Sequence, residues 1–154
     1  MRHTTLDIQT VQPGPQTPVS DVEPQLSPDG RWLAYVTSET GGYETFVQPF
    51  PSSGAKWQVP VPGGRQPIWR RDSRELFLVT SDRRLYAIDV RPGVATLEFG
   101  APRFLFDMQA NTVSVRNSYA VTPDGQRFPV NRLFDPADQT PTINVVVNWL
   151  GGTR

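Results

Sequence analysis

The sequence predicts an all-β chain in which a short antiparallel unit recurs about three times. No stretch of the 154 residues has sustained 3.6-residue periodicity, so we expect almost no helix. The chain contains 16 prolines and 12 glycines, which separate short apolar runs and indicate many turns. One turn motif occurs three times, and 8 Phe, 4 Tyr and 4 Trp supply enough apolar surface for the repeats to fold.

The repeat is found by aligning the chain with itself. Residues 26–38 align without a gap on residues 69–81, an offset of 43 positions, and residues 121–130 form a third copy 52 positions further on. Offsets of this size are typical of one supersecondary unit per repeat. The turn residues that we expect to be structural are Asp29, Gly30, Asp72, Asp124 and Gly125.

Each copy predicts a hairpin. A short strand enters a turn in which proline presets φ, aspartate bonds to nearby backbone N–H groups and glycine accepts a positive φ. The strand after the turn is almost continuously apolar, which predicts burial on both of its faces. We place these three strands at residues 32–37, 75–80 and 127–131.

Further strands follow in each copy. An alternating pattern predicts them at residues 43–50 and 84–90, and the third copy continues after a longer polar loop into residues 143–149. Two positions depart from the repeat. Ser73 replaces the turn glycine of the second copy, and Pro129 removes a ladder donor from the central strand of the third copy.

The N-terminal part of the chain differs from the repeats in composition. Residues 1–22 are polar and rich in proline, so we interpret them as an arm. Within the arm, Leu6 and Ile8 alternate with polar side chains and give a strand-like segment at residues 6–11. The repeats occupy residues 23–154, with units at about 23–62, 63–108 and 109–150.

The ordered motifs resemble TolB-like, WD-repeat-like β-propellers, and especially the C-terminal propeller blades of bacterial serine/threonine protein kinases. The resemblance rests on SPDGRWLAY at 27–35, YETFVQPFP at 43–51, PIWRRD at 67–72 with ELF at 75–77, and VVVNW at 145–149. It implies a toroid of four-stranded blades, usually six or more, around a channel. The chain would then be a partial propeller of about three four-stranded blades, half of a six-bladed ring.

A run of three blades would leave two apolar outer faces and unpaired strand edges in water. Two copies related by a two-fold axis could cover them by closing a six-bladed ring, so we expect a homodimer or another self-association. The third copy has no clear fourth strand after Trp149, and residues 6–11 could complete that blade in the same chain or in a partner. We therefore take Leu6, Ile8 and Trp149 as interface candidates.

The composition argues against catalysis and metal binding. Cysteine is absent and the single histidine, His3, lies beside the N-terminus, so thiolate chemistry is excluded and a histidine triad is disfavoured. Neither a G-x-S-x-G elbow nor the kinase signatures occur. The turns themselves explain the recurring aspartates, and Asp135 with Asp138 gives too few ligands for calcium. We predict a chain that is not an enzyme, with no catalytic residue, metal or cofactor.

The charge balance names no global electrostatic partner. Fifteen basic and fifteen acidic residues cancel, which argues against binding to nucleic acid or to an anionic membrane. No apolar stretch approaches the roughly 20 residues that span a bilayer, and the N-terminus lacks the apolar run of a signal peptide. We expect a soluble protein without membrane insertion; the chain as given carries no export address, while the resemblance allows a periplasmic or extracytoplasmic location.

Arginine is unevenly distributed along the chain. Six arginines fall within 20 positions: Arg65, Arg70, Arg71, Arg74, Arg83 and Arg84. One interpretation is a rim patch on the second blade for an acidic peptide or an anionic ligand, because guanidinium groups suit carboxylates and phosphates. The other, which we favour, is a solvated set of turn and strand-end side chains, partly neutralised by nearby acids.

Three possibilities for the function remain open on the sequence alone, and the third is a self-assembling piece with no ligand of its own. The first is a non-catalytic scaffold that binds a protein, a peptide or another ligand and closes its ring by homodimerisation. The second is a sensor or accessory propeller fragment of a larger kinase or peptidase. Fold class alone does not decide between them.

Overall fold

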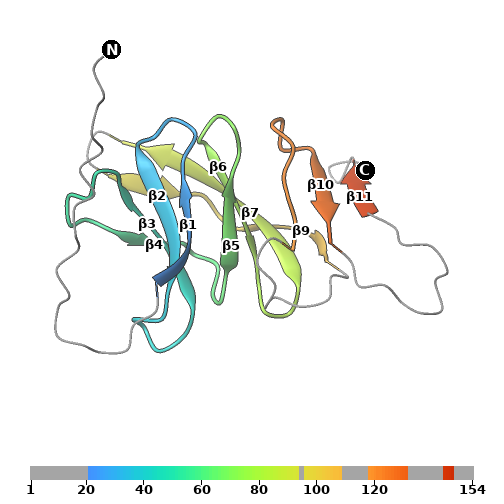
Figure 1. The fold of residues 1–154 in the computed structure, drawn as a ribbon, viewed down its shortest axis with the longest axis horizontal. Helices are drawn as coiled ribbons and strands as arrows, with labels where there is room; N and C mark the ends of the chain where they lie inside the picture. Colours follow the sequence, from blue (N-terminus) through green and yellow to red (C-terminus); the bar gives the residue numbers. More distant parts are fainter. Residues whose placement is uncertain (1–20, 94–95, 109–117, 132–143, 148–154) are drawn as a thin grey trace, which may run out of the picture.

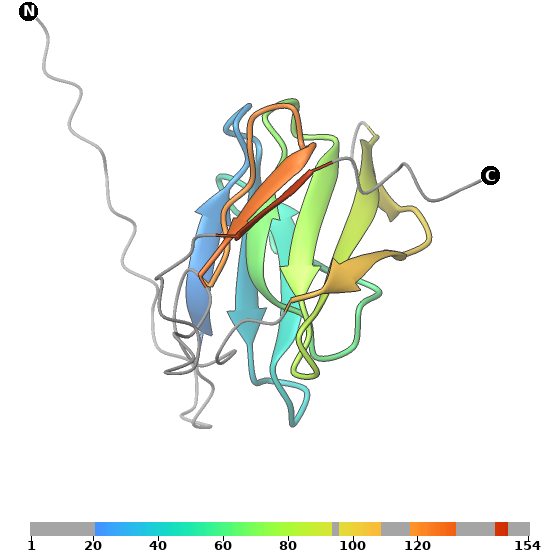
Figure 2. The same cartoon turned by 90° about the vertical axis from the view of Figure 1, so that its right-hand side faces the viewer.

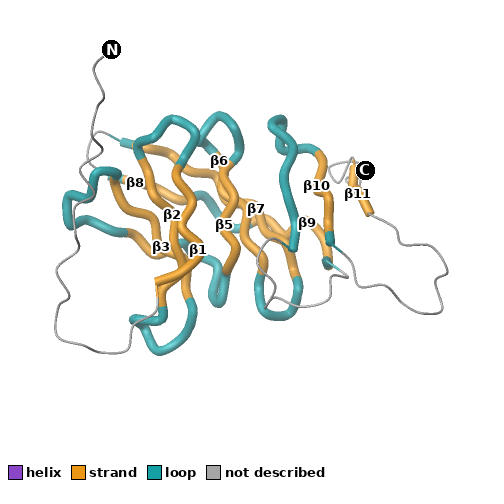
Figure 3. Tube along the Cα trace, viewed as in Figure 1, coloured by secondary structure: helices purple, strands orange, loops and turns teal. Residues whose placement is uncertain are grey.

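The computed structural model describes residues 21–93, 96–108, 118–131 and 144–147. These residues form antiparallel strands joined by turns and loops, and none of them is helical (Figure 3). The predicted all-β fold is therefore confirmed. The strands lie in three consecutive sheets that stand side by side along the long axis of the molecule (Figure 1).

The first sheet is a four-stranded antiparallel meander. Its strands follow the chain in the order β1 (Asp21–Leu26), β2 (Trp32–Thr37), β3 (Glu44–Pro49) and β4 (Trp57–Gln58). The register pairs Leu33 with both Leu26 and Gln48, and Tyr35 with Phe46, so these side chains share one face of the sheet.

The second sheet repeats this plan with one added strand. Its strands are β5 (Arg65–Trp69), β6 (Glu75–Val79), β7 (Arg84–Pro92), β8 (Leu97–Phe99) and β9 (Arg103–Asp107). The long β7 pairs with β6 on one side; on its other side its beginning pairs with β9 and its end with β8. The fourth position of this blade is therefore held by β9.

The described part of the third sheet contains β10 (Arg127–Val130) and β11 (Asn144–Val147). A segment around Tyr119 joins β10 through a bridge to Val130, and Ala120 donates its N–H to the carbonyl oxygen of Pro129. The backbone N and O atoms of Pro129 therefore both point toward this inner segment. The hydrogen bond that a proline cannot donate would have gone to the inner segment, so the pairing with β11 loses no donor. This explains how a proline fits in the central strand.

The three sheets are held together by two apolar cores, one between each pair of neighbours. Strand β6 contributes to both: Leu76 and Leu78 pack toward the first sheet, and Phe77 and Val79 toward the third. All five residues of β6 are buried: the four apolar residues Leu76 to Val79, as their pattern predicts, and also the charged Glu75. Figure 2 looks onto the third sheet and shows β10 and β11 in front of the second. Sheets packed face to face with a central strand buried on both sides make up part of a β-propeller.

The turn motif is repeated in its backbone hydrogen bonds as well as in sequence. The N–H groups of Gly30, Ser73 and Gly125 each donate to the carbonyl oxygen three residues earlier, at 2.8, 3.0 and 2.8 Å. All three residues have a positive φ, of 73°, 60° and 71°. Ser73 thus adopts the left-handed conformation that glycine adopts in the other two copies.

A second repeated feature interrupts the inner strand of the first two sheets. Strand β1 has a bulge between Val22 and Gln25, and β5 has one at the equivalent place between Arg65 and Ile68. Each bulge contains a non-glycine residue with a positive φ: Glu23 at 57° and Gln66 at 52°. A bulge redirects a side chain, and here it sends both side chains toward the next sheet.

Candidate functional site

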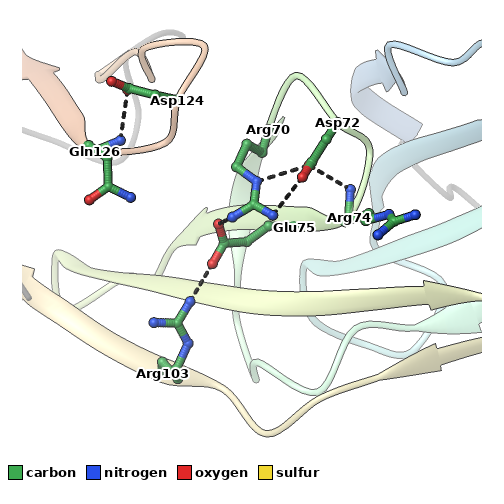
Figure 4. A network of polar contacts seen from close by, with 7 residues as sticks. All are labelled: Arg70, Asp72, Arg74, Glu75, Arg103, Asp124 and Gln126. Atoms are coloured by element: carbon green, nitrogen blue, oxygen red, sulfur yellow. Dashed lines mark hydrogen bonds and ion pairs between the residues drawn. The ribbon is translucent and has the colours of Figure 1, made fainter.

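The recurring aspartates hold their own turns. The Oδ1 atom of Asp72 accepts the backbone N–H of Arg74 at 3.0 Å, and that of Asp124 accepts the N–H of Gln126 at 3.0 Å (Figure 4). In the first copy the Oδ1 atom of Asp29 accepts the hydroxyl of Ser27 at 2.6 Å. Each carboxylate is occupied within its own turn. Among the described residues, no three His, Cys, Asp or Glu side chains are grouped so that they could hold a metal ion.

Asp72 differs from Asp124 in having a guanidinium partner. Arg70 donates Nε and Nη2 to the two carboxylate oxygens of Asp72, at 2.9 and 2.7 Å. This hydrogen bonding lowers the pKa of Asp72, and the N–H of Arg74 adds to the effect. The pKa of Asp124 is lowered by hydrogen bonds from the Thr122 hydroxyl and the Gln126 N–H. The ionised form is therefore favoured in both turns.

We expect Asp72→Asn to weaken the fold at neutral pH, by less than about 1 kcal/mol because the pair is partly exposed. The folded-state pKa lies below the unfolded value of about 3.9, so the ionised carboxylate stabilises the fold above that pH. This stabilisation is lost as the pH falls through the folded-state pKa. Urea titrations at pH 7, 5 and 3 should show wild type and variant converging in acid.

The matched control for this prediction is Asp124→Asn, which keeps the turn acceptor in the same motif. The loss in free energy of unfolding caused by Asp124→Asn should depend less on added salt than the loss caused by Asp72→Asn. Among the described residues, Asp124 has no ion pair that corresponds to the contact between Arg70 and Asp72. A gap between wild type and Asp72→Asn that stays constant from pH 7 to pH 3 would contradict this account of the ion pair.

Arg70 is part of a larger network around a buried carboxylate (Figure 4). Its Nη1 atom lies 2.7 Å from Glu75 Oε2, and Arg103 bonds to the other oxygen of Glu75. Burial raises the pKa of Glu75, while the two guanidinium groups act in the opposite direction. A Cβ placed on Gly125 would lie 2.9 Å from Cδ of Arg70, so the third sheet's turn packs on this arginine. Arg70 therefore serves the joint between the second and third sheets.

The other predicted rim arginines lie at both ends of the second sheet. Arg71 and Arg74 are exposed in the turn between β5 and β6. Arg83 lies in the turn between β6 and β7 and Arg84 begins β7, at the opposite end of the strands. Arg65 pairs in register with Val79 and so lies at this second end. The structure thus does not bring the six arginines into one patch, because an antiparallel hairpin separates its two turns by the length of a strand.

Arg65 is engaged by the first sheet. Its Nη2 atom lies 3.3 Å from Oε1 of Glu23, and its guanidinium carbon lies 4.4 Å from the centre of the Tyr43 ring. Arg84 pairs with Asp107 at 3.3 Å and with Asp82 at 3.4 Å. Both arginines therefore already have carboxylate partners within the chain.

A cleft of about 430 Å³ lies beside this second end of the sheet. Its walls include Pro60, Pro62, Pro102 and Tyr86, and Asp82 lies at its polar side. Thr80 donates its hydroxyl to Asp82, and Arg84 pairs with the same carboxylate. The carboxylate of Asp82 thus already has hydrogen-bond and ion-pair partners within the chain.

Among the described residues, an apolar surface lies on the outer face of the first sheet, the one turned away from the second sheet. We call it the open face and define it by Leu26, Leu33, Tyr35, Phe46 and Phe50. Leu26 and Phe50 are 47% and 49% exposed. Leu33 and Tyr35 are half-buried, and Phe46 is buried beneath its neighbours on this face at 7% exposure. Large apolar side chains gathered on one sheet face are typical of an interaction surface.

The second sheet shows what the same positions look like when they are covered. Trp69 is equivalent to Leu26 in the strand register. Val90 is equivalent to Phe50, because the N–H of Val90 donates to the carbonyl oxygen of Arg74 and the N–H of Phe50 donates to that of Arg31, each at 2.8 Å. Trp69 is only 7% exposed and Val90 only 2%, since the first sheet packs on them. The open face is therefore built like a covered one.

The edge of the open face carries a small polar cluster. Lys56 lies 5.3 Å from the centre of the Phe46 ring and donates to Glu39 Oε1 at 2.6 Å. Tyr35 stacks on Phe46, with ring centroids 6.4 Å apart. Burial raises the pKa of Tyr35 to about 12, and Glu39 and Asp21 add to the effect. Tyr35 therefore remains a neutral phenol on this face at physiological pH.

The sequence analysis expected an apolar outer face at each end of the three blades, but it did not identify the residues of the open face. The alignment of residues 26–38 with 69–81 already placed Leu26 opposite Trp69, but exposure could only be read from the packing. The interface candidates Leu6, Ile8 and Trp149 lie outside the described residues. In the part of the chain that the structure describes, no helix is long and apolar enough to cross a membrane.

Comparison with known proteins gives matches among solved structures, but none among family models or curated proteins. No family model matches the sequence, and no curated protein matches it. Among the solved structures, 20 chains match. One is TolB from Acinetobacter baumannii, with a TM-score of 0.36 and 14% sequence identity over 83% of this chain. The chain spans 41% of the length of that protein. The fold assignment rests on the strand registers and the packing described above.

Proposed function

We propose that this chain is a non-catalytic β-propeller scaffold that binds protein, and that a second copy covers its open face to close a ring. The observation that supports this is the pair of equivalent positions in the first two sheets. Leu26 and Phe50 are about half exposed, whereas Trp69 and Val90 are buried by the preceding sheet. A blade packed on the open face would remove this apolar surface from water, at roughly 25 cal/mol for each Å².

A second copy can supply that blade in a closed arrangement. In a two-fold ring, the third sheet of each copy meets the first sheet of the other. The same joint is therefore formed twice, and it covers the open face of both chains. Each chain would contribute its three consecutive sheets in the same order. The ring would then hold six blades, a number that suits propeller closure.

A second candidate is a sensor or accessory propeller segment that works with further blades of a larger kinase or peptidase. The observation that favours it lies on the third sheet. Arg127 and Asn131 are exposed where the equivalent positions of the second sheet, Glu75 and Val79, are buried. The outer face of the third sheet is therefore more polar than the face that the second sheet turns toward the third. Such a polar face is less suited to pack on the apolar open face of a second copy.

The test is the molar mass in solution. We expect light scattering to give twice the 17.2 kDa of the chain at high concentration and to fall toward the monomer on dilution. A folded monomer across the whole concentration range would reject the homodimer and favour the second candidate. Circular dichroism on the same samples establishes that the chain is folded.

A further inference from the structure

We infer that the three repeated turns form a binding surface for an acidic protein segment, whose separated carboxylates pair with arginines from consecutive turns. We call this surface the turn ridge and define it by the turns at residues 28–31, 71–74 and 123–126, together with Arg127, which begins β10. The inference rests on the proposed function, because it names a protein partner for the scaffold. The ridge lies at one end of the strands and the open face is a sheet face, so the two surfaces can be tested separately.

The three turns touch one another, so the turn ridge is continuous. The backbone N–H of Asp29 in the first turn donates to the hydroxyl oxygen of Ser73 in the second turn, at 3.1 Å. The third turn packs on the second, since a Cβ placed on Gly125 would lie 2.9 Å from Cδ of Arg70. In Figure 1 the three turns lie along the upper edge of the molecule. Sheets packed face to face are about 10 Å apart, so consecutive turns are separated by about that distance.

The aspartates of the turn ridge are bonded to the turns themselves. Asp29 Oδ1 accepts the backbone N–H of Arg31 at 3.2 Å, and Asp72 and Asp124 accept the equivalent N–H groups of their own turns at 3.0 Å. The three carboxylates are therefore held close to the backbone. Arginine carries its charge at the end of a longer side chain, so the guanidinium groups of the ridge can reach a partner beyond these carboxylates.

Three arginines of the turn ridge lack a carboxylate partner among the described residues. Arg71, Arg74 and Arg127 are exposed, and none of them forms an ion pair with a described Asp or Glu. In Figure 4 the side chain of Arg74 extends away from Asp72, to which only its backbone N–H is bonded. These three guanidinium groups come from two consecutive turns and are available to an external carboxylate.

The arginines at the opposite end of the strands are engaged within the chain. Arg65 pairs with Glu23 at 3.3 Å, and Arg84 pairs with Asp107 at 3.3 Å. A carboxylate that approached either of them would compete with a partner that is already in place. The turn ridge is therefore the end of the molecule at which an acidic partner gains new ion pairs.

The mixture of charges on the turn ridge selects the class of partner. Asp29, Asp72 and Asp124 lie between the arginines, so the ridge is not uniformly basic. Nucleic acid and anionic membranes present dense negative charge, which would meet these carboxylates as well as the arginines. A peptide can place its carboxylates at the arginines alone. An extended peptide rises about 3.3 Å per residue, so acidic residues at every third position match turns about 10 Å apart.

The experiment titrates the isotope-labelled full chain with two capped peptides of identical composition, followed by NMR at low ionic strength. One is Glu-Gly-Ser-Glu-Gly-Ser-Glu, with an acid at every third position, and the other is Glu-Glu-Glu-Gly-Ser-Gly-Ser. We expect the spaced peptide to bind at least about threefold more tightly, because only its carboxylates match the separation of the turns. It should shift the Nε–H signals of Arg71, Arg74 and Arg127, and added salt should weaken it.

Substitutions that remove single charges locate the site. Arg71→Gln should raise the Kd of the spaced peptide about threefold, as expected for one exposed ion pair, and the triple substitution of Arg71, Arg74 and Arg127 by Gln should raise it about 30-fold. The matched control is Arg84→Gln, which removes one charge from a 51% exposed side chain at the opposite end and should leave the Kd unchanged. Circular dichroism establishes that each variant is folded.

The outcomes separate this inference from the proposed homodimer. Equal binding of the two peptides, or equal losses from Arg71→Gln and Arg84→Gln, overturns the inference. Tighter binding of a short oligothymidylate or of phosphatidylserine vesicles than of the spaced peptide also overturns it. The turn ridge lies within one chain, so a monomer, including Phe50→Asp, that binds the spaced peptide supports the ridge even where the homodimer fails. A dimer that does not bind the peptide overturns the ridge while the proposed homodimer stands.

Discussion

Replacing Phe50 by Asp is expected to convert the proposed homodimer into a folded monomer. Phe50 is 49% exposed on the open face, so a carboxylate there stays hydrated in the free chain and costs the fold little. In the ring the same carboxylate would be enclosed in an apolar joint, at the position where Val90 is buried in the second sheet. Enclosing an unpaired charge is strongly unfavourable, so we expect the dimer Kd to rise at least about 100-fold.

The chain offers a closely matched control in Phe104→Asp. Phe104 is the same residue type and is 50% exposed, but it lies on β9, at the outer edge of the second sheet. It should retain the wild-type Kd in light scattering across a dilution series. Equal dissociation by the two variants would show that the open face is not the joint, and no dissociation by Phe50→Asp would lead to the same conclusion.

Replacing Phe128 by Ala is expected to have the largest effect on the free energy of unfolding. Phe128 is fully buried, and its ring centroid lies 5.1 Å from that of Phe77 and 5.6 Å from that of Phe106. It is the central contact of the third sheet with the second. Removing such a ring leaves a cavity and costs about 3–5 kcal/mol, a large share of the roughly 5–15 kcal/mol that stabilises a domain.

Urea titration followed by circular dichroism measures this loss. Amide exchange should show where it acts: protection should fall in β10 before it falls in β6, because β6 keeps its contacts with the first sheet. Phe104→Ala removes the same ring type from a half-exposed site where its main ring contact is Tyr86, at 5.9 Å, so it should cost much less than Phe128→Ala, about 1 kcal/mol. Equal losses from the two substitutions would contradict the assigned core.

Much of the fold could be predicted because the repeat carries its own structural signals. The four consecutive apolar residues of β6, Leu76 to Val79, indicated a strand covered on both faces, and the structure places them between two cores. The alternating pattern of residues 84–90 predicted most of β7. These features depend on local hydrophobicity and turn chemistry, which are visible along the chain.

The interaction between sheets was much less predictable. The hydrogen bonds from Glu23 and Gln66 to the following sheet depend on positive φ values at these two residues, whose types do not signal a left-handed conformation. The arginines are neighbours in sequence, but the direction of β6 moves Arg83 and Arg84 away from Arg71 and Arg74. The exposure of Leu26 follows from which blade lies next to it, and a pattern within one repeat contains no such information.

The hydrogen bonds by which Glu23 accepts from Gln66, and Gln66 from Ser118, also bear on how the chain is made. A ribosome releases the first sheet before the second, and the second before the third. The carboxylate of Glu23 is therefore already present when Gln66 emerges, and the amide of Gln66 is present when Ser118 emerges. Each newly synthesised repeat thus finds its hydrogen-bond acceptor already present on the preceding repeat. The chain can therefore add its sheets one at a time during synthesis.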